Sequence, residues 1–258
     1  MSSSNRKHDK IIENEGIIEG RNAVTEALRS GVNIDKVFIS KGDTDATLKH
    51  IASKARSAGA AVVEADKRKL DSMSITKSHQ GVIAMAAFAD YVSIDDILEI
   101  AKKRGEEPLI IICDEISDPH NLGAIIRTCE ATGAHGVVIP KRRSAGSSAT
   151  VAKASSGAIF HTAIARVANI TAAVRELKKA GVWLYAASMD SKNTLWDTDF
   201  TGATAFVIGS EGSGISKLVS ENCDLKVSIP MSGKLSSLNA SVSAAVLLFE
   251  AVRQRKQV

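Results

Sequence analysis

The stretch that decides the fold is LKVSIPMSGKLSSLNASVSAAVLLFEAVRQR, residues 225–255. It begins as a short apolar strand, and Pro230 ends this strand because proline cannot donate a hydrogen bond to a central ladder. A loop of Gly, Ser and Lys follows, and then a helix with one apolar face, which Ser236 or Ser237 could cap. An ordinary capped helix would give the same pattern. Strand, loop and helix in this order are also where α/β proteins bind ligands, so the stretch predicts an α/β fold with a candidate site.

The composition is that of a globular protein without a membrane segment. The chain has 258 residues, enough for one large core or for a small domain and a larger one. Its apolar content of 44% and charged content of 24% are ordinary. The N-terminus MSSSNRKHDK lacks the apolar core of a signal peptide, and no apolar run reaches membrane-spanning length. We therefore expect a cytoplasmic protein with residues 1–15 as a disordered tail.

The three cysteines, Cys113, Cys129 and Cys223, are widely separated and show no CxxC spacing. This pattern supports neither a metal site nor a disulfide framework. We interpret all three as small buried apolar side chains.

The net charge of +4 indicates a mild preference for anionic partners. One basic cluster stands out: Lys141, Arg142 and Arg143 precede a Ser/Gly-rich segment that ends at Lys153. This cluster is either a solvated charged face or a surface for nucleic acid. Basic residues also end the chain, and a solvated face is the simpler interpretation there.

Residues 16–90 alternate between helical and strand patterns, which predicts a small α/β domain. The expected helices are residues 20–29, 47–59 and 66–73, and the expected strands are residues 36–40, 60–65 and 81–88. The more polar residues 91–108 follow, with a helical pattern in IDDILEIAKKRG, and we interpret them as a linker.

A second alternation begins at residue 109, and its strands are continuous apolar runs of the buried, parallel kind. The expected strands are residues 109–113, 136–140, 162–167, 182–188, 205–209 and 225–230. The expected helices between them are residues 124–132, 148–156, 170–180 and 215–223. This pattern predicts a doubly wound sheet of about six strands in a domain of residues 109–258.

Three of these strands end in polar loops that contain glycine: DEISDPHNLGAIIRT, GSEGSG and the loop after Pro230. Ligands bind at the carboxyl ends of strands in such sheets, so the three loops predict one shared site. The chain has no GxxxxGK[ST] motif and no GxGxxG after its first strand, which argues against nucleoside triphosphate and dinucleotide sites. His120 is a lone loop histidine, which is more typical of a surface residue than of a base.

The blocks NLGAIIRT, FVIGSEGSG and IPMSGKLSSLNASVS resemble the three motifs of the SpoU/TrmH family of RNA 2′-O-ribose methyltransferases, within the SPOUT superfamily. The block IIEGRNAVTEAL resembles the start of the N-terminal RNA-binding domain of the RlmB-type subgroup. The resemblance covers nearly the whole chain after about residue 16.

This resemblance implies S-adenosylmethionine as cofactor, an obligate homodimer, an L30e-like N-terminal domain and a C-terminal trefoil knot. It also implies a structured RNA as substrate and neither DNA nor a membrane as partner. The RlmB-type members methylate a guanosine in the peptidyl-transferase region of 23S ribosomal RNA, which makes that nucleotide the leading substrate. The alternatives are transfer RNA, another ribosomal RNA ribose, or a non-catalytic RNA-binding or ribosome-assembly factor with the same fold.

The resemblance also assigns roles to residues. The catalytic group would be Arg127, Asn121, Glu211, Ser237 and Asn239. The cofactor would lie against Gly209, Gly212, Ile229, Met231 and Leu238. Lys141, Arg142, Arg143 and Lys153 would contact RNA, and no metal is implied. Val242, Ala245, Val246 and Phe249 have the helical spacing of a dimer contact face, although a helix buried in a monomer would look the same.

Overall fold

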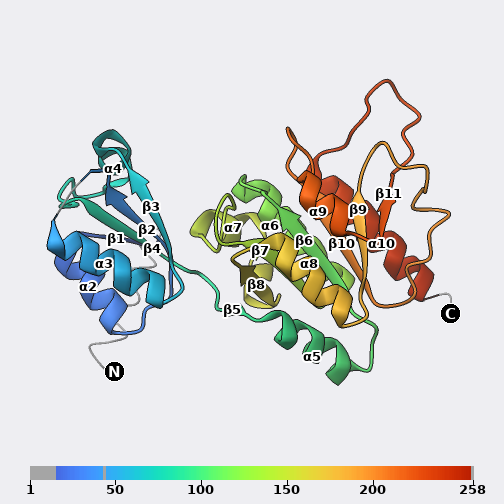
Figure 1. Cartoon of the computed structure of the whole chain (residues 1–258), viewed down its shortest axis with the longest axis horizontal. Helices are drawn as coiled ribbons and strands as arrows, with labels where there is room; N and C mark the ends of the chain where they lie inside the picture. Colours follow the sequence, from blue (N-terminus) through green and yellow to red (C-terminus); the bar gives the residue numbers. More distant parts are fainter. Residues whose placement is uncertain (1–15, 43–44, 257–258) are drawn as a thin grey trace. The chain divides into compact units, whose positions relative to one another are not determined.

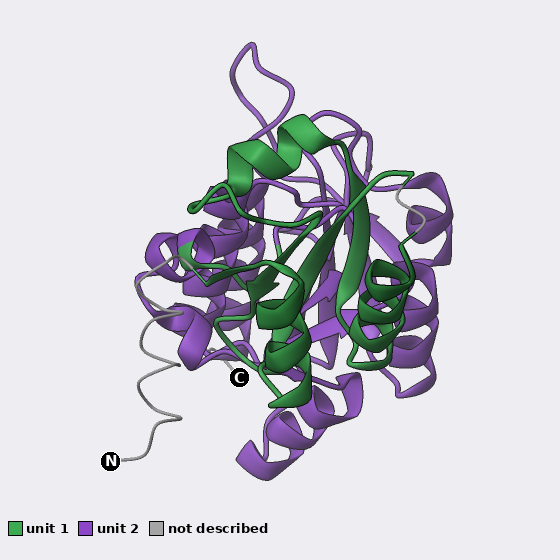
Figure 2. Ribbon diagram, turned by 90° about the vertical axis from the view of Figure 1, so that its left-hand side faces the viewer, with its two compact units in different colours: residues 1–90, 146–149 green, residues 91–145, 150–258 purple. Residues whose placement is uncertain are grey.

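The computed structural model describes residues 16–42 and 45–256, and the chain forms two compact units (Figure 2). Unit 1 comprises residues 1–90 and 146–149, and unit 2 comprises residues 91–145 and 150–258. The expected disordered tail, residues 1–15, lies outside the described residues. Within the described ranges, no helix has the length and apolar character needed to cross a membrane.

Unit 1 contains a mixed sheet of four strands among its described residues, in the order β1-β4-β2-β3 (Figure 1). The strands are β1 (Ile17–Glu19), β2 (Ile34–Ser40), β3 (Ala61–Ala65) and β4 (Val82–Ala86). The helices are α2 (Arg21–Arg29), α3 (Ala46–Ser57) and α4 (Lys67–Met73). The sequence pattern predicts all of these elements except β1, because a strand of three residues is too short to show a period.

The described part of unit 2 contains a parallel sheet of seven strands, in the order β11-β9-β10-β6-β7-β8-β5. The strands are β5 (Tyr91–Val92), β6 (Leu109–Asp114), β7 (Gly136–Pro140), β8 (Ile164–Val167), β9 (Trp183–Ala187), β10 (Thr204–Gly209) and β11 (Leu225–Val227). The doubly wound α/β class is confirmed. The seventh strand is β5, which pairs with β8 and comes from the segment that we interpreted as a linker.

Residues 91–108 are therefore the first elements of unit 2 rather than a linker. Helix α5 (Ile94–Arg104) begins with a capping box in which Ser93 and Asp96 bond each other's backbone N–H groups. Its residues Ile94 and Ile97 are buried in the core of unit 2. The polar exposed face of α5 concealed this apolar stripe in the sequence.

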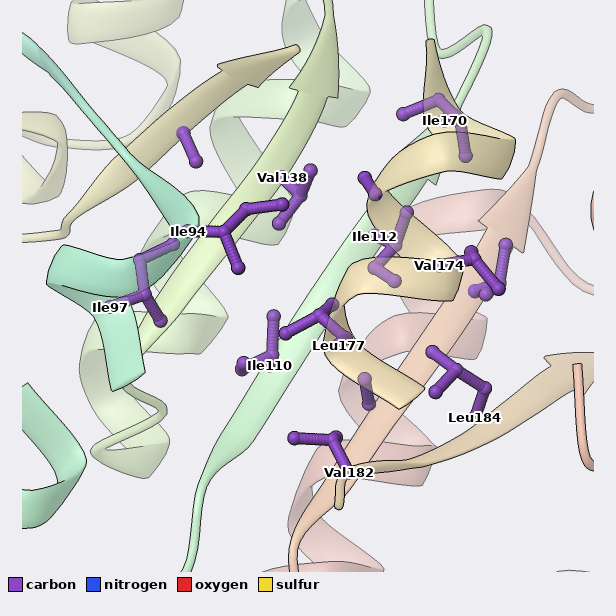
Figure 3. Close-up of a cluster of buried hydrophobic side chains, with 14 of the residues drawn as sticks. Ile94, Ile97, Ile110, Ile112, Val138, Ile170, Val174, Leu177, Val182 and Leu184 are labelled. Atoms are coloured by element: carbon purple, nitrogen blue, oxygen red, sulfur yellow. The ribbon is translucent and has the colours of Figure 1, made fainter. Parts of the chain in front are cut away.

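The remaining helices of unit 2 are α6 (Pro119–Thr132), α7 (Ala149–Ala154), α8 (Ile170–Lys179), α9 (Lys217–Asn222) and α10 (Ala240–Arg255), with a short 3₁₀ turn, η1 (Ala158–Phe160). Side chains of α5 and α8 pack over the central strands (Figure 3). Ile110 and Ile112 of β6 join this cluster, whereas Ile111 points to the other face of the sheet and is also fully buried. Burial on both faces explains why β6 is one continuous apolar run.

None of the three cysteines, all of which the structure describes, forms a disulfide. Cys113 and Cys129 are buried and Cys223 is half-buried. Burial raises the pKa of the Cys113 thiol to about 12 and that of Cys129 well above its usual value. Because only the thiolate is a good nucleophile or metal ligand, these thiols are inert side chains of the core.

Arg255, near the end of α10, binds backbone carbonyl groups instead of forming a solvated basic end. Its guanidinium donates to the carbonyl oxygens of Phe200 at 3.1 Å, Glu107 at 2.7 Å, Pro108 at 2.9 Å and Gly202 at 2.7 Å. These bonds fasten the last turn of α10 to the segments before β6 and β10.

We expect Arg255→Ala to lower the free energy of unfolding by about 2–4 kcal/mol, because it removes several charge-assisted hydrogen bonds that join the end of α10 to two other segments. Lys256→Ala, which alters the exposed neighbouring residue, is the control and should change it by less than about 0.5 kcal/mol. Urea unfolding of both variants checks this prediction. Equal midpoints for the two would show that the Arg255 bonds contribute little.

Candidate active site

Unit 2 has a cavity of about 560 Å³ at the carboxyl ends of β9, β10 and β11. The walls come from the loops after these strands, from α9 and from the start of α10. The sheet order explains the position: β10 inserts between β9 and β6, and the chain then reverses to place β11 on the far side of β9. Ligands of open α/β sheets bind where the strand order reverses in this way.

All five residues expected to contact the cofactor line this cavity: Gly209, Gly212, Ile229, Met231 and Leu238. Its volume lies within the range of about 300–1,000 Å³ that small-molecule sites occupy. Apolar side chains such as Ile229 and Leu238 lie beside glycine backbone and several serine hydroxyl groups. This mixture of an apolar wall and polar groups fits a nucleoside with a charged amino-acid tail.

Gly209 allows the loop after β10 to fold back on itself. The N–H of Gly214 donates to the carbonyl of Ser210 at 2.9 Å, which closes a tight turn. A Cβ atom at Gly209 would lie 2.1 Å from the carbonyl carbon of Gly214 and 2.2 Å from the nitrogen of Ile215. Atoms cannot approach so closely, so this loop conformation requires glycine at residue 209.

Three polar side chains from distant segments meet near the cavity: Asn121 on α6, Glu211 after β10 and Asn239 before α10. The Asn121 amide donates to Glu211 Oε1 at 3.0 Å, and the Asn239 amide donates to Asn121 Oδ1 at 2.9 Å. The Asn239 amide also donates to Glu211 Oε1. Glu211 and Ser237 line the cavity itself. The structure thus brings together four of the five residues expected in the catalytic group.

Asn239 also caps α10, which corrects the expected cap at Ser236 or Ser237. Its Oδ1 accepts from the N–H groups of Ser241 at 2.9 Å and Val242 at 3.3 Å. The helix begins only at Ala240, so the two serines are too far before it to reach its free N–H groups. Asn239 therefore caps the helix through its side-chain oxygen and bonds to the polar cluster through its side-chain nitrogen.

Arg127 is the expected catalytic residue that does not join this cluster. Residues on an α-helix are about 100° apart, so Arg127 lies about 120° around α6 from Asn121. Its side chain is exposed, whereas Leu122 and Ile126 of the same helix are buried. Within a single chain, Arg127 therefore faces away from the core of its unit.

The four expected RNA contacts also lie outside the cavity lining. Lys141 is half-buried just after β7, and Arg142 and Arg143 are exposed beside it. Lys153 is exposed on α7. Arg143 forms an ion pair with Glu115, whose carboxylate Oε1 lies 2.7 Å from Nη1 of the guanidinium.

Two features of the site were missed in the sequence. Met189 and Asp190, after β9, line the cavity together with two of the three loops that we identified, the loop after β10 and the loop after Pro230. Asp114, the last residue of β6, is buried, and its Oδ2 accepts from the N–H of Ser216 at 2.8 Å, which ties down the loop after β10. The sequence held a signal for each feature. The loop after β9 was expected at the same edge of the sheet as the other loops, and Asp114 is an acidic residue at the end of an otherwise apolar strand.

Comparison with protein families gives two matches that together span most of the chain. The model described as the SpoU rRNA Methylase family matches residues 108–249. The model described as RNA 2′-O ribose methyltransferase substrate binding matches residues 17–92.

Individual relatives agree with these matches. The chain is 40% identical over 253 residues to the putative TrmH family tRNA/rRNA methyltransferase YacO of Bacillus subtilis, covering 98% of each protein. The crystal structure of the SpoU methyltransferase AviRb from Streptomyces viridochromogenes with its cofactor AdoMet has a TM-score of 0.59 and 25% identity, covering 94% of this chain and 91% of AviRb. A crystal structure of an RNA 2′-O ribose methyltransferase has a TM-score of 0.54 and 26% identity, covering 96% and 92%. This chain therefore belongs to the SpoU/TrmH family of RNA 2′-O-ribose methyltransferases, which use S-adenosylmethionine as methyl donor.

Proposed function

We propose that this protein methylates the ribose 2′-hydroxyl of a guanosine in the peptidyl-transferase region of 23S ribosomal RNA, in the cytoplasm. The observation that carries the catalytic part is the hydrogen-bonded cluster of Asn121, Glu211 and Asn239 beside a cavity suited to a nucleoside. The match of residues 17–92 to an RNA substrate-binding model and the resemblance of IIEGRNAVTEAL to the RlmB-type subgroup support a ribosomal RNA target. Transfer RNA is the second candidate, because the relative in B. subtilis is named for both RNA classes.

The cofactor would bind in the 560 Å³ cavity, within a trefoil knot formed by the C-terminal loops. When bound, S-adenosylmethionine supplies an electrophilic methyl group on its sulfonium sulfur. Gly209 and Gly212 would let backbone approach the adenosine closely. Ile229, Met231 and Leu238 would exclude water from its apolar faces.

The polar cluster would position the RNA ribose beside the donor. Glu211 Oε1 accepts from the amides of both Asn121 and Asn239, so these two side chains are held in fixed orientations. Asn239 uses both of its N–H groups within the cluster, whereas Asn121 uses one and Glu211 accepts through Oε1, so one Asn121 N–H and Glu211 Oε2 are available for the ribose. Ser237 would add a hydroxyl at the cavity wall. Holding the 2′-oxygen in line with the methyl group lowers the barrier by removing the search for a reactive geometry.

A homodimer would complete the site. Arg127 faces solvent in a single chain, so a second copy is the simplest source of a cation for the cluster of the first. Helix α10 exposes Val242 and Phe249, which are 45% and 54% accessible, with Ala245 and Val246 half-buried between them. Because these side chains remain exposed on the monomer, burying them against a second copy would be favourable.

The reaction is tested by incubating the protein with labelled S-adenosylmethionine and with ribosomal or transfer RNA from a strain that lacks the gene. We expect label in 23S ribosomal RNA, on one guanosine ribose that mapping identifies. Label in transfer RNA alone would replace the substrate proposal. Absence of label in both RNAs would favour a non-catalytic RNA-binding role.

The basic run 141–143, with Lys153, would bind RNA phosphates. Changing Lys141, Arg142 and Arg143 together to Gln should weaken RNA binding and reduce the slope of log K against log salt by about 2, because each phosphate contact contributes roughly 0.7–0.9. The similar basic run 102–104 on α5 gives a matched control, and its triple Gln variant should keep the wild-type slope. Filter binding at several salt concentrations checks both. A wild-type slope in the first variant would exclude the run from the RNA site.

A further inference from the structure

The last residue of β6 and the two residues that follow it each accept a hydrogen bond from a loop near the site. The Asp114 carboxylate accepts from the N–H of Ser216 after β10. The next residue, Glu115, accepts from Arg143 Nη1 at 2.7 Å. The Ile116 carbonyl then accepts from the N–H of Ala145 at 3.1 Å. The loop after β7 is thus fastened to the end of β6 at two points, one of which is a side-chain ion pair.

Both ends of this ion pair have a backbone conformation that side chains disfavour. Glu115 has a φ of 59° and Arg143 a φ of 57°, in the left-handed region where glycine is normally found. An exposed ion pair adds little to folding stability, and the Arg143 and Glu115 side chains are 77% and 38% accessible. Strained backbone tends to cluster at ligand-binding positions, so this pair is better explained by binding than by stability.

The free edge of Arg143 suits a phosphate. A guanidinium has five N–H donors in a rigid plane, and Glu115 engages it through Nη1. The exposed remainder can donate two parallel bonds to a phosphodiester, which is the geometry that arginine binds best. A partner that already holds the guanidinium in place reduces the rotamer entropy lost when RNA binds.

We propose that Glu115 is a positioning residue that holds the Arg143 guanidinium for a backbone phosphate of the RNA strand entering the site. Glu115 lies on the connection between β6 and α6 that leads to Asn121. One segment of the chain would therefore position both the phosphate and the reacting ribose. The proposal rests on the proposed function, because it takes RNA as the substrate. The proposal goes further than the proposed function because it assigns Arg143, unlike the other members of the basic run, a defined contact with one phosphate.

The test is a double-mutant cycle of Glu115→Gln and Arg143→Ala, read by steady-state kinetics with RNA. Glu115→Gln keeps the side-chain shape and removes its charge, and it should raise the KM for RNA about fivefold while kcat stays unchanged. Arg143→Ala should raise it about tenfold or more. The double variant should resemble Arg143→Ala alone, because Glu115 acts through Arg143. Glu99→Gln, which removes another exposed ion-paired carboxylate of unit 2, is the control and should match wild type.

Three results would overturn the proposal. A lower KM in Glu115→Gln would mean that Glu115 competes with the phosphate for Arg143. Additive effects in the double variant would mean that the two residues act independently. Binding of S-adenosylmethionine and thermal unfolding should not change in any variant, and a matching loss there would show a merely structural role. Filter binding measures the affinity of the same variants for unmethylated RNA and needs no turnover. The coupling between Glu115 and Arg143 can therefore be tested even if the methyl-transfer proposal fails.

Discussion

Arg127→Ala is expected to reduce kcat by about 10²–10³-fold, the usual effect of removing one group that stabilises developing charge. An arginine guanidinium keeps its proton at neutral pH, which makes it a poor general base. It can instead stabilise the alkoxide that forms as the ribose hydroxyl attacks the methyl group, through charge-assisted hydrogen bonds. The affinity for S-adenosylmethionine should stay at the wild-type value, because the cavity lining does not include Arg127.

Single-turnover kinetics and calorimetry measure these two quantities. His120→Ala is the matched control, because His120 is also an exposed side chain on α6, about two turns before Arg127. It should leave kcat near the wild-type value. Near-normal turnover of Arg127→Ala with unchanged RNA binding would remove Arg127 from the catalytic group.

Mixing two inactive variants tests whether Arg127 acts on the cavity of a second copy. In a mixed dimer of Arg127→Ala with Glu211→Gln, one site would combine an intact cavity with an intact arginine from the other chain. Random exchange in a two-fold dimer should restore roughly a quarter of wild-type activity. If Arg127 acted on the cavity of its own chain, both sites of the mixed dimer would be defective and no activity would return.

Gly209→Ala is expected to weaken S-adenosylmethionine binding by about 100-fold, because a methyl group that overfills a packed site costs roughly 3 kcal/mol. The added Cβ would lie 2.1 Å from the Gly214 carbonyl carbon, so the turn that shapes the cavity wall must open. Backbone cannot swing aside as the end of a flexible side chain can. The loss should therefore appear in cofactor binding.

Calorimetric titration with S-adenosylmethionine measures the effect, and thermal unfolding shows whether the variant remains folded. Gly233→Ala is the matched control: it lies in the loop before α10, and a Cβ there would meet nothing within 4 Å. It should bind the cofactor as the wild type does. Equal affinities for the two alanine variants would show that the turn after β10 does not form the cofactor site.

The elements that the sequence predicts well are those with a long local pattern. Strands β6 and β10 are continuous apolar runs because both of their faces are buried. Strands β1 and β5 were missed, since three and two residues carry no period and pair only through contacts with distant segments. The cap of α10 was placed two or three residues too early, because Ser, Ser and Asn are all good caps and the sequence does not say where the loop ends.

The candidate site shows the same limit at a longer range. Asn121 and Glu211 are 90 positions apart, and Asn239 and Asn121 are 118 apart, yet their side chains hydrogen-bond. The sequence motifs identified each residue as a candidate. The residues meet because β6 and β10, which precede Asn121 and Glu211, are neighbours in the strand order β10-β6-β7. The ion pair between Glu115 and Arg143 had no sequence signal, because it depends on two left-handed backbone positions.

By itself, the sequence determined the α/β class, the buried strands, the three glycine-bearing loops and the resemblance to a methyltransferase family. These follow from local periodicity and from motifs, which each segment carries without its neighbours. Only the tertiary structure decided that Asn239 both caps α10 and joins the polar cluster, that Arg127 faces outward, and that Glu115 holds Arg143. Side chains meet across a sheet only when strand order and loop conformation are set, and those depend on packing of the whole unit.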